Sequence, residues 1–433
     1  MRLKEWILLV FIIGSGLFFH FREELFDRIE ESIIINDLRK EYLFTETKEI
    51  SPPFPSLINV KNKHGEIRII GKDLNKIKIC LKKRIYTKSQ KKANKIGEKL
   101  KIDIIQNKEK LVISSNRDEF RKKIKTDFEI FLPKTVSLKV YNSYGTVLVE
   151  NISGDVSIEN SHGKIFAREI GGELSAVNAY ASLNVEGVYN DCYLKNKHAP
   201  INVMNVKGKV KMEQKYGIIT LGNIEGETIV FAPHSELIAN KIGKTIKIEN
   251  SYNKIFLRNI EKAIIRGHHS SVEIKDANGV KVENNYGKVY ISNVRGDLKI
   301  SGKYLLINAS NISGDRIEIS SSYRDTKLID FLGDLNISLS HGDLLLKPRH
   351  LISDIKVLAS YSNIKFFWPK GEKIPFEGKV KYGKIKADFP LPLKFYRENG
   401  IVYIKAFEHI KDKPKIFIST SYGDLYLKEG AFN

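Results

Sequence analysis

Residues 142–163, NSYGTVLVENISGDVSIENSHG, contain one complete unit of the pattern that decides the fold. A ring followed by a small residue, called the landmark below, stands at Tyr144 and again, 18 positions later, at His162. Between the two, apolar residues alternate with polar ones, as at Val147 and Val149. Period-two alternation of β-branched residues predicts short strands that each bury one face.

The landmark recurs through the rest of the chain, always as Tyr or His. It is spaced by 18 residues at positions 144, 162, 180, 198, 216, 234 and 252. The series continues at His269, Tyr286, Tyr304, Tyr323, His341, Tyr361, Tyr382 and Tyr422, with spacings that drift between 17 and 21 and one unit blurred near Tyr403. Such a period, without helices between the strands, predicts an all-β fold: a β-solenoid (parallel β-helix-like) of 18-residue two-strand repeats over 141–433. Tyr and His alternate as far as Tyr286, so one coil could also be a pair of units, 36 residues, and a β-propeller is the opposing architecture.

Asparagine recurs at two further positions of the unit. It stands two residues before the landmark at Asn142, Asn160, Asn178, Asn196, Asn250 and Asn284. It opens the mid-unit turn at Asn151, Asn205, Asn223, Asn259, Asn293 and Asn311. Asparagine tolerates the left-handed backbone of turns. Aligned amides in stacked turns are therefore expected to hydrogen-bond along the stack.

Residues 56–140 depart from the repeat and are expected to cap the N-terminal end of the solenoid. Several strand-like segments accompany an amphipathic helix predicted over 87–100, with Thr87 or Ser89 as its N-cap. The open strand edges at the end of a solenoid require such a cover.

Near the C-terminus the repeat is interrupted. Four prolines fall within 368–393, which predicts an insertion there. Residues 416–427 return to the repeat pattern and are expected to close the rod.

The N-terminus carries an export pattern. Arg2 and Lys4 precede an uncharged, mostly apolar stretch from Trp6 to Phe19. This predicts a signal peptide or an uncleaved membrane anchor over residues 1–20, followed by a spacer over 21–55. The protein is accordingly expected to be exported and to belong to the cell envelope.

Charge and cysteine content limit the classes of partner. The chain has 72 Lys and Arg against 51 Asp and Glu, a net charge of +21, and only 2 Cys. Between residues 60 and 140 there are 24 basic and 9 acidic residues, so this segment alone carries 24 − 9 = +15. A basic patch suits an anionic polymer or a membrane surface, although a solvated face gives the same composition. We find no nucleic-acid-binding motif, and two cysteines exclude a disulfide scaffold.

Several motifs together resemble a known family. They are Leu57–Val60, the segment KHGEI at 63–67, a Lys-rich helix, Phe128–Pro133, and the repeated NSYG and ISGDVSI. Over about residues 50–430 this layout resembles the bacterial DUF4097 family of adhesin-like (head GIN-like) β-repeat domains. The resemblance implies an exported, solenoid-like protein and brings no catalytic residues. This sequence departs from the family in placing Tyr or His at the landmark, where family members often carry Asn or Thr.

Six histidines occupy the landmark position or its N-terminal echo: His64, His162, His198, His234, His269 and His341. In a 36-residue coil four of them would stack one strand spacing apart and could form a metal column. In an 18-residue coil a tyrosine separates each from the next, and chelation fails. Because Tyr replaces His along the series, we expect stacking rather than metal binding.

Other short motifs have structural explanations. Gly-Asp pairs recur in the turns at Gly154-Asp155, Gly296-Asp297, Gly314-Asp315, Gly333-Asp334, Gly342-Asp343 and Gly423-Asp424. Calcium-binding solenoids are denser in both residues, so we expect no calcium. Arg295-Gly296-Asp297 spells a cell-attachment tripeptide, but it falls in register with the repeat turn, which favours chance. Cys192 is predicted to be buried.

We find no phosphate-binding loop, nucleophile elbow or zinc-protease helix. The sequence therefore predicts no enzyme activity and no catalytic, cofactor-binding or metal-binding residue. Our hypothesis is an adhesin-like binding or scaffolding rod whose partner is an anionic polysaccharide, a lipid surface or an envelope protein. The alternatives are an envelope-stress or regulatory sensor and, behind it, a glycan-cleaving β-helix enzyme with clustered carboxylates in a groove.

Overall fold

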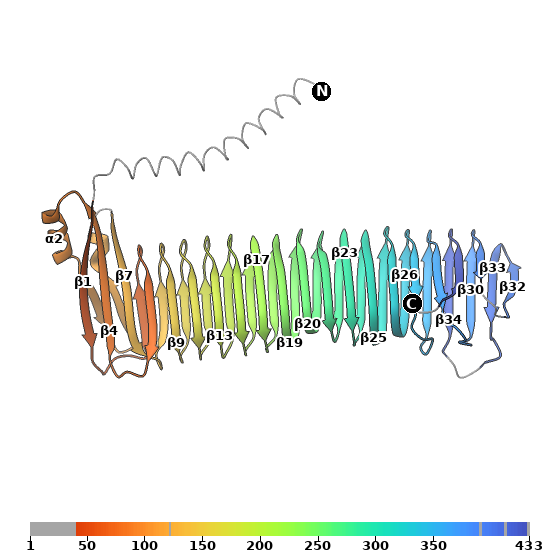
Figure 1. The fold of residues 1–433 in the computed structure, drawn as a ribbon, viewed down its shortest axis with the longest axis horizontal. Helices are drawn as coiled ribbons and strands as arrows, with labels where there is room; N and C mark the ends of the chain where they lie inside the picture. Colours follow the sequence, from red (N-terminus) through yellow and green to blue (C-terminus); the bar gives the residue numbers. More distant parts are fainter. Residues whose placement is uncertain (1–39, 121–122, 389–391, 411–413, 431–433) are drawn as a thin grey trace, which may run out of the picture.

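The computed structural model describes residues 40–120, 123–388, 392–410 and 414–430. They form a long β-solenoid of about 18-residue repeats in which 67% of the residues lie in strands (Figure 1). The one α-helix of this described part is α2 (Gln90–Lys99), at the N-terminal end of the rod. The predicted all-β solenoid with a strand and helix cap is confirmed.

Strand pairing settles the coil length. β9 (Val147–Ile152) pairs in parallel with β11 (Ile165–Ile170), and β11 pairs in parallel with β13 (Leu183–Val188). Each step is a shift of 18 residues, so a coil is one unit and the 36-residue alternative is wrong. A propeller is wrong as well, because successive units stack along one axis in parallel register.

Each coil contributes one strand to each of two facing parallel sheets. The strands before the landmark turn form sheet one: β2 (Leu57–Lys61), β8 (Ser137–Tyr141), β10 (Val156–Glu159), β12 (Leu174–Val177), β14 (Cys192–Asn196), β16 (Val210–Gln214), β18 (Thr228–Pro233), β22 (Val280–Asn285), β24 (Leu298–Lys303) and β28 (Ile355–Ser360). The strands after it form sheet two: β3 (Ile67–Lys72), β9, β11, β13, β15 (Ile201–Val206), β17 (Gly217–Ile224), β21 (Ser271–Ala277), β23 (Gly287–Val294), β27 (Leu344–Lys347) and β29 (Ile364–Trp368). Four long strands bend through the mid-unit turn from sheet two into sheet one: β19 (Ser235–Ser251), β20 (Lys254–His268), β25 (Leu305–Ser322) and β26 (Thr326–Ser340).

The core fills the space between the two sheets. Alternate side chains of each strand point inward, as the burial of Val147, Val149 and Ile152 in β9 shows. These aliphatic side chains join one cluster that runs from the cap to the last coil. The rod therefore has one continuous hydrophobic core between the two sheets. The turns that connect the sheets form its two edges.

The N-terminal cap is built from antiparallel strands. β1 (Lys40–Ile50) pairs with β4 (Ile77–Thr87), β4 pairs with β7 (Ile124–Pro133), and β7 joins the first coil through β3. On the other sheet β5 (Ile102–Gln106) pairs with β6 (Lys110–Ser115), and a 3₁₀ turn, η1 (Asn116–Glu119), leads out of β6.

Two sequence expectations meet the structure in this cap. The predicted helix is α2, and its N-cap is Ser89, whose hydroxyl accepts the backbone N–H of Lys92. Residues 40–50, which the sequence placed in the spacer, form strand β1 instead. Exposure alternates along this edge strand, but its half-buried face includes Glu46 and Lys48, so the sequence lacks the apolar alternation that reveals the other strands.

The C-terminal end has a non-sequential order of coils. β30 (Phe376–Lys381) and β31 (Ile385–Asp388) form the outermost coil, and the hairpin of β32 (Lys394–Glu398) and β33 (Ile401–Ala406) pairs with β30. β34 (Ile416–Ser421) then inserts between β28 and β30, and β35 (Leu425–Glu429) between β29 and β31. The prediction that 416–427 closes the rod is therefore wrong. Each coil contacts only its neighbours, so the repeat pattern does not specify their order in space.

The expected signal peptide or anchor and most of the spacer lie outside the described residues. Within the described ranges, no helix combines the length and the apolar character needed to cross a membrane.

Candidate functional site

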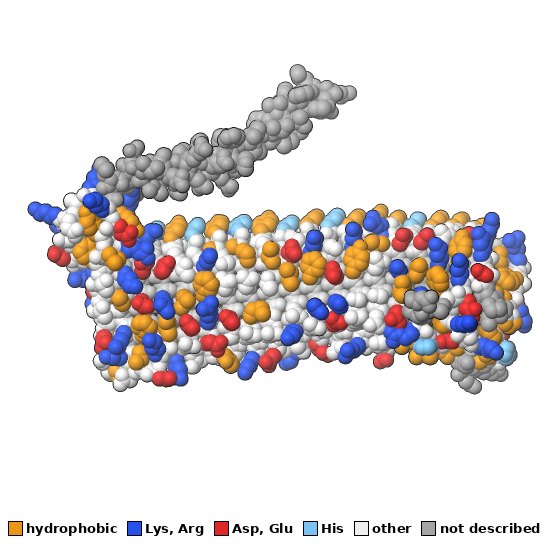
Figure 2. All heavy atoms as spheres, viewed as in Figure 1, with side chains coloured by type: hydrophobic (Ala, Val, Ile, Leu, Met, Phe, Trp, Pro, Cys, Tyr) orange, Lys and Arg blue, Asp and Glu red, His pale blue; other side chains and the backbone are white. Residues whose placement is uncertain are grey.

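The landmark turns form one edge of the rod, and it carries a continuous column of stacked rings. Neighbouring ring centroids lie 4.5–5.5 Å apart and neighbouring planes differ by 4–24°. In spatial order the rings are His64, Tyr144, His162, Tyr180, His198, Tyr216, His234, Tyr252, His269, Tyr286, Tyr304, Tyr323, His341, Tyr361, Tyr422 and Tyr382. Figure 2 shows this column as an alternating row of hydrophobic and His side chains along one edge.

This ring column offers a ligand its edges rather than its faces. Each ring uses both faces on its neighbours, so stacking of a sugar or base onto a ring is blocked along the column. The predicted stacking is confirmed: Tyr180 lies between His162 and His198, at 4.8 Å and 5.4 Å between ring centroids. Among the described residues, no group of three His, Cys, Asp or Glu side chains is placed to hold a metal ion.

A row of buried amides lies beneath the rings. The Asn160 Nδ2 donates to the carbonyl oxygen of Gly145 in the preceding coil and to that of Gly163 in its own turn, both at 2.9 Å. Asn178 and Asn196 repeat this arrangement, and Gln214 replaces asparagine one coil later. These amides thus bind the backbone of the preceding coil and not one another, which differs from the expected amide ladder.

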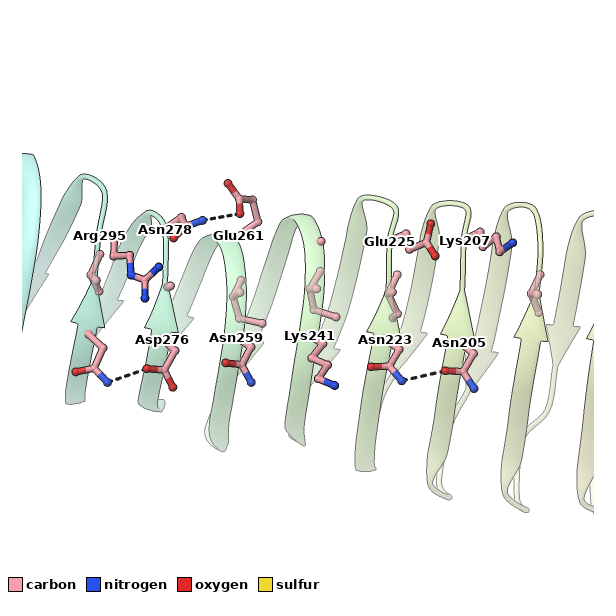
Figure 3. A pocket seen from close by; sticks show the side chains of 18 of the residues that line it. Asn205, Lys207, Asn223, Glu225, Lys241, Asn259, Glu261, Asp276, Asn278 and Arg295 are labelled. Carbon is pink, nitrogen blue, oxygen red and sulfur yellow. Dashed lines mark hydrogen bonds between the residues drawn. The ribbon is translucent and has the colours of Figure 1, made fainter.

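The mid-unit turns form the opposite edge, which contains an open polar groove of about 1050 Å³ (Figure 3). Its floor follows a column of residues with left-handed backbone, φ between 50° and 71°. From the N-terminal end the floor residues are Glu169, Gly187, Asn205, Asn223, Lys241, Asn259, Asp276, Asn293 and Asn311. The sequence predicted the asparagines as turn residues, and their left-handed conformation is confirmed. It missed the groove, for which the only sequence signal is the shared 18-residue register.

The amide ladder expected from the sequence occurs in this groove. The Asn223 Nδ2 donates to the Asn205 Oδ1 at 3.0 Å, and the Asn311 Nδ2 donates to the Asn293 Oδ1 at 2.8 Å. Asn293 in turn donates to the Asp276 carboxylate at 2.7 Å. An amide has two N–H donors and two acceptor lone pairs, so each rung keeps hydrogen-bonding capacity for a ligand.

Side chains define both ends of the groove. At the C-terminal end the Arg349 guanidinium donates to the Asn311 Oδ1 at 2.7 Å and to the Asp330 carboxylate at 2.5 Å. At the N-terminal end stands the half-exposed ring of Tyr189, with the Lys207 ammonium 4.7 Å from its centroid. The groove is therefore a bounded segment of the edge.

Carboxylates on the outer face of sheet one are paired across coils. A hydrogen bond from Lys195, at 2.6 Å, lowers the pKa of Glu213, and a hydrogen bond from Lys247, also at 2.6 Å, lowers the pKa of Glu227. Lowered values keep these carboxyl groups ionised, the opposite of what a general acid in glycan cleavage requires.

The Gly-Asp pairs have a structural role. The Asp155 carboxylate accepts the backbone N–H of Glu173 in the next coil at 2.9 Å. Asp297, Asp334, Asp343 and Asp424 do the same for their next coils. Asp297 of the cell-attachment tripeptide is therefore engaged in the turn.

Both cysteines are free, and the prediction that Cys192 is buried is confirmed. Its burial strongly raises the pKa of its thiol.

Basic side chains concentrate on the cap. Lys91, Lys92 and Lys95 are exposed on α2, whose opposite face buries Ala93 and Gly97. In Figure 2 Lys and Arg side chains cluster at this end of the rod. The cap therefore presents a cationic helix at the end of the rod.

Comparisons with known proteins find one family model and several solved structures that are similar to this chain. A family model described as Toastrack DUF4097 matches residues 245–428, which confirms the family resemblance for that part of the chain. A solved structure from Clostridium sporogenes, described as a "putative cell adhesion protein", is 10% identical, covers 90% of this chain and 100% of its own, and has a TM-score of 0.22. Another from Parabacteroides merdae, described as a "putative adhesin", is 15% identical, covers 57% and 95%, and has a TM-score of 0.25. No curated protein matches the chain.

Proposed function

We propose that this Toastrack-containing chain is a non-catalytic binding rod of the cell envelope. Its basic cap holds it to an anionic surface or polymer, and the rod presents its edges to an extended partner. The observation that carries the proposal is the segregation of charge along the fold.

The cap and the rod differ sharply in charge. Residues 60–140 carry +15, whereas the much longer repeat region 141–433 contains 41 basic and 32 acidic residues, 41 − 32 = +9. The cap strands and α2 stack at one end of the rod (Figure 1). A strong positive field at one end attracts anionic lipids or polymers there and leaves the rest of the rod free.

Two further observations support the proposal. The lowered pKa values of Glu213 and Glu227 suit cross-coil pairing better than catalysis. The basic-then-apolar segment at residues 2–19 supports export or anchoring, on sequence grounds alone. The described chain enters the fold at Lys40 in the cap, so an anchor would hold the cap near the membrane.

The test is vesicle cosedimentation of the full chain with phosphatidylglycerol–phosphatidylcholine vesicles at increasing salt. The triple variant K91E/K92E/K95E removes three cationic groups from α2. At about 1 kcal/mol per lysine near an anionic surface, affinity should fall at least 100-fold. Glutamate in the first turns of a helix suits the helix dipole, so the cap should stay folded.

The matched control K288E/K303E/K327E makes the same change on exposed lysines of the rod. It should bind like the wild type, because those lysines are remote from the cap. Apolar insertion of the N-terminal segment is insensitive to salt and persists on pure phosphatidylcholine, which separates it from the cap effect. Equal loss in both triple variants, or binding with no component that needs phosphatidylglycerol and weakens with salt, would show that the cap is not the attachment site.

A further inference from the structure

We propose that the mid-unit groove binds a single chain of a neutral, extended, β-1,4-linked glycan parallel to the rod axis. This inference rests on the proposed binding role of the rod and adds the chemistry of its partner. It requires nothing of the cap.

The shape of the groove calls for a polymer. The column from Gly187 to Asn311 crosses seven coil-to-coil steps, which at ~4.8 Å per strand spacing gives about 34 Å. It is open along its length and bounded at its ends by Tyr189 and Arg349. One coil spacing is close to the length of one sugar ring in an extended β-linked chain, so successive sugars would meet successive turns. Neighbouring sugars of a β-1,4-linked chain are flipped, so every second sugar would present the same edge to the groove.

The floor of the groove is chemically suited to hydroxyl groups. Asn205 and Asn223 present amides on neighbouring coils, and Asn259 follows two coils later, with Lys241 between (Figure 3). Asn293 and Asn311 continue the column beyond Asp276. Ladder hydrogen bonds fix their orientation, as between Asn223 and Asn205, so little side-chain entropy remains to be lost on binding. Each amide can donate to one sugar hydroxyl and accept from another.

The charges that line the groove nearly cancel, which gives no preference for a polyanion. Three basic side chains, Lys207, Lys241 and Arg295, stand against the four acidic ones, Glu169, Glu225, Glu261 and Asp276, for a net charge of −1. In a chain of net charge +21, this edge offers no advantage to a polyanion.

A protein or lipid partner also fits poorly. The aliphatic residues along the groove, such as Ile224, Ile242 and Ile260, are buried in the core and expose almost no apolar surface. Protein interfaces typically have an apolar centre, whereas the exposed apolar side chain among the described lining residues is Tyr189, at one end of the groove. Of the partner classes considered, an uncharged, hydroxyl-rich polymer chain fits the groove best.

The experiment is isothermal titration of the full chain, in a detergent without a sugar headgroup, with cellohexaose and chitohexaose. Cellobiose and hexagalacturonate serve as the short and the acidic comparators. We expect saturable binding of at least one neutral hexasaccharide, at least tenfold tighter than that of cellobiose, because the disaccharide spans only two rungs.

The double variant N223G/N259G removes two rungs at positions where φ is 53° and 54°, a conformation that glycine adopts without strain. It should weaken hexasaccharide binding at least tenfold. The matched control N399G makes the same change at φ 47° in the turn between β32 and β33, away from the groove, and should bind normally.

Three results would overturn the inference. They are no saturable binding of either neutral hexasaccharide, equal affinity of N223G/N259G and wild type, and tighter binding of hexagalacturonate than of the neutral glycans. Vesicle binding through the cap is measured separately, and N223G/N259G should leave it unchanged. Failure of the groove is thus distinguishable from failure of the proposed attachment.

Discussion

Replacing Asn178 by aspartate tests whether the buried amides beneath the ring column hold neighbouring coils together. The Asn178 side chain is 2% exposed, and its Nδ2 donates to the carbonyl oxygens of Gly163 at 2.9 Å and Ala181 at 2.8 Å. Its Oδ1 accepts the backbone N–H of Ala179 at 3.0 Å. Aspartate has nearly the same shape and keeps the acceptor but lacks both donors. N178D therefore removes one of the two amide donors to each carbonyl oxygen and faces both oxygens with a carboxylate, while Asn160 still donates to Gly163 and Asn196 to Ala181.

The expected cost follows from those two carbonyl groups. Each lost hydrogen bond costs about 1 kcal/mol, and a buried carboxylate facing two carbonyl oxygens adds to this, so the total loss should be about 2 kcal/mol or more at neutral pH. Each coil contacts only its neighbours, so the loss should appear first as local opening around residues 160–196. Hydrogen exchange by mass spectrometry resolves this opening, and urea unfolding gives the overall loss.

The cost should depend on pH with a defined sign. Burial beside two carbonyl oxygens disfavours the charged carboxyl, so its pKa in the folded variant is raised. The protonated form regains one donor. The deficit is therefore smallest below the unfolded-state pKa of about 4 and grows as pH rises through the folded-state value.

The matched control is N190D. The Asn190 side chain is exposed, and its Oδ1 accepts the N–H of Asp191 at 3.1 Å, a role that aspartate retains. N190D should unfold within about 0.5 kcal/mol of the wild type. The reasoning fails if N178D matches N190D, or if its deficit increases as the pH is lowered.

Three further predictions concern the coil contacts and the thiols. In G163A the new Cβ would lie 1.7 Å from the Gly145 carbonyl oxygen, so the free energy of unfolding measured in urea should fall by about 2 kcal/mol or more. In the control G279A the nearest contact is at 3.9 Å, so its free energy of unfolding should change little. The backbone N–H of the next coil lowers the pKa of Asp424, so its stabilisation is present above about pH 4 and is lost as pH falls through the folded-state value. D424N keeps a neutral acceptor, and its melting temperature should vary less between pH 5 and pH 2 than that of the wild type; equal variation would contradict this. Maleimide at pH 7 should label one thiol of the native protein, because Cys192 is buried with a raised pKa, and two in urea; native labelling of Cys192 would contradict its burial.

The fold was accessible to sequence reasoning because the repeat is local. Val147 and Val149 alternate with polar residues, and the landmark returns about every 18 residues. The sequence of each unit is therefore sufficient to predict its two strands and its turn. The ring column was equally readable, because a side chain repeated at one period in a solenoid must align with its copies. The left-handed asparagines followed from turn chemistry.

The features that the sequence did not predict all depend on contacts between segments that lie side by side in the fold. The order of the last coils was lost because Ile416–Glu429 carries the same pattern wherever it inserts. Strand β1 was missed because its half-buried face mixes apolar residues with Glu46 and Lys48. The amides beneath the rings bind backbone carbonyls of the preceding coil, a partner that no sequence spacing names.

The sequence by itself determined that this protein is a solenoid of 18-residue two-strand units with a basic cap, because hydrophobic period and turn residues are properties of each unit. Only the tertiary structure decided that one unit is one coil, that the final coil inserts between two earlier ones, and that mid-unit turns form a polar groove. Those features arise from how coils stack on one another, and residues 18 apart in sequence meet only after stacking.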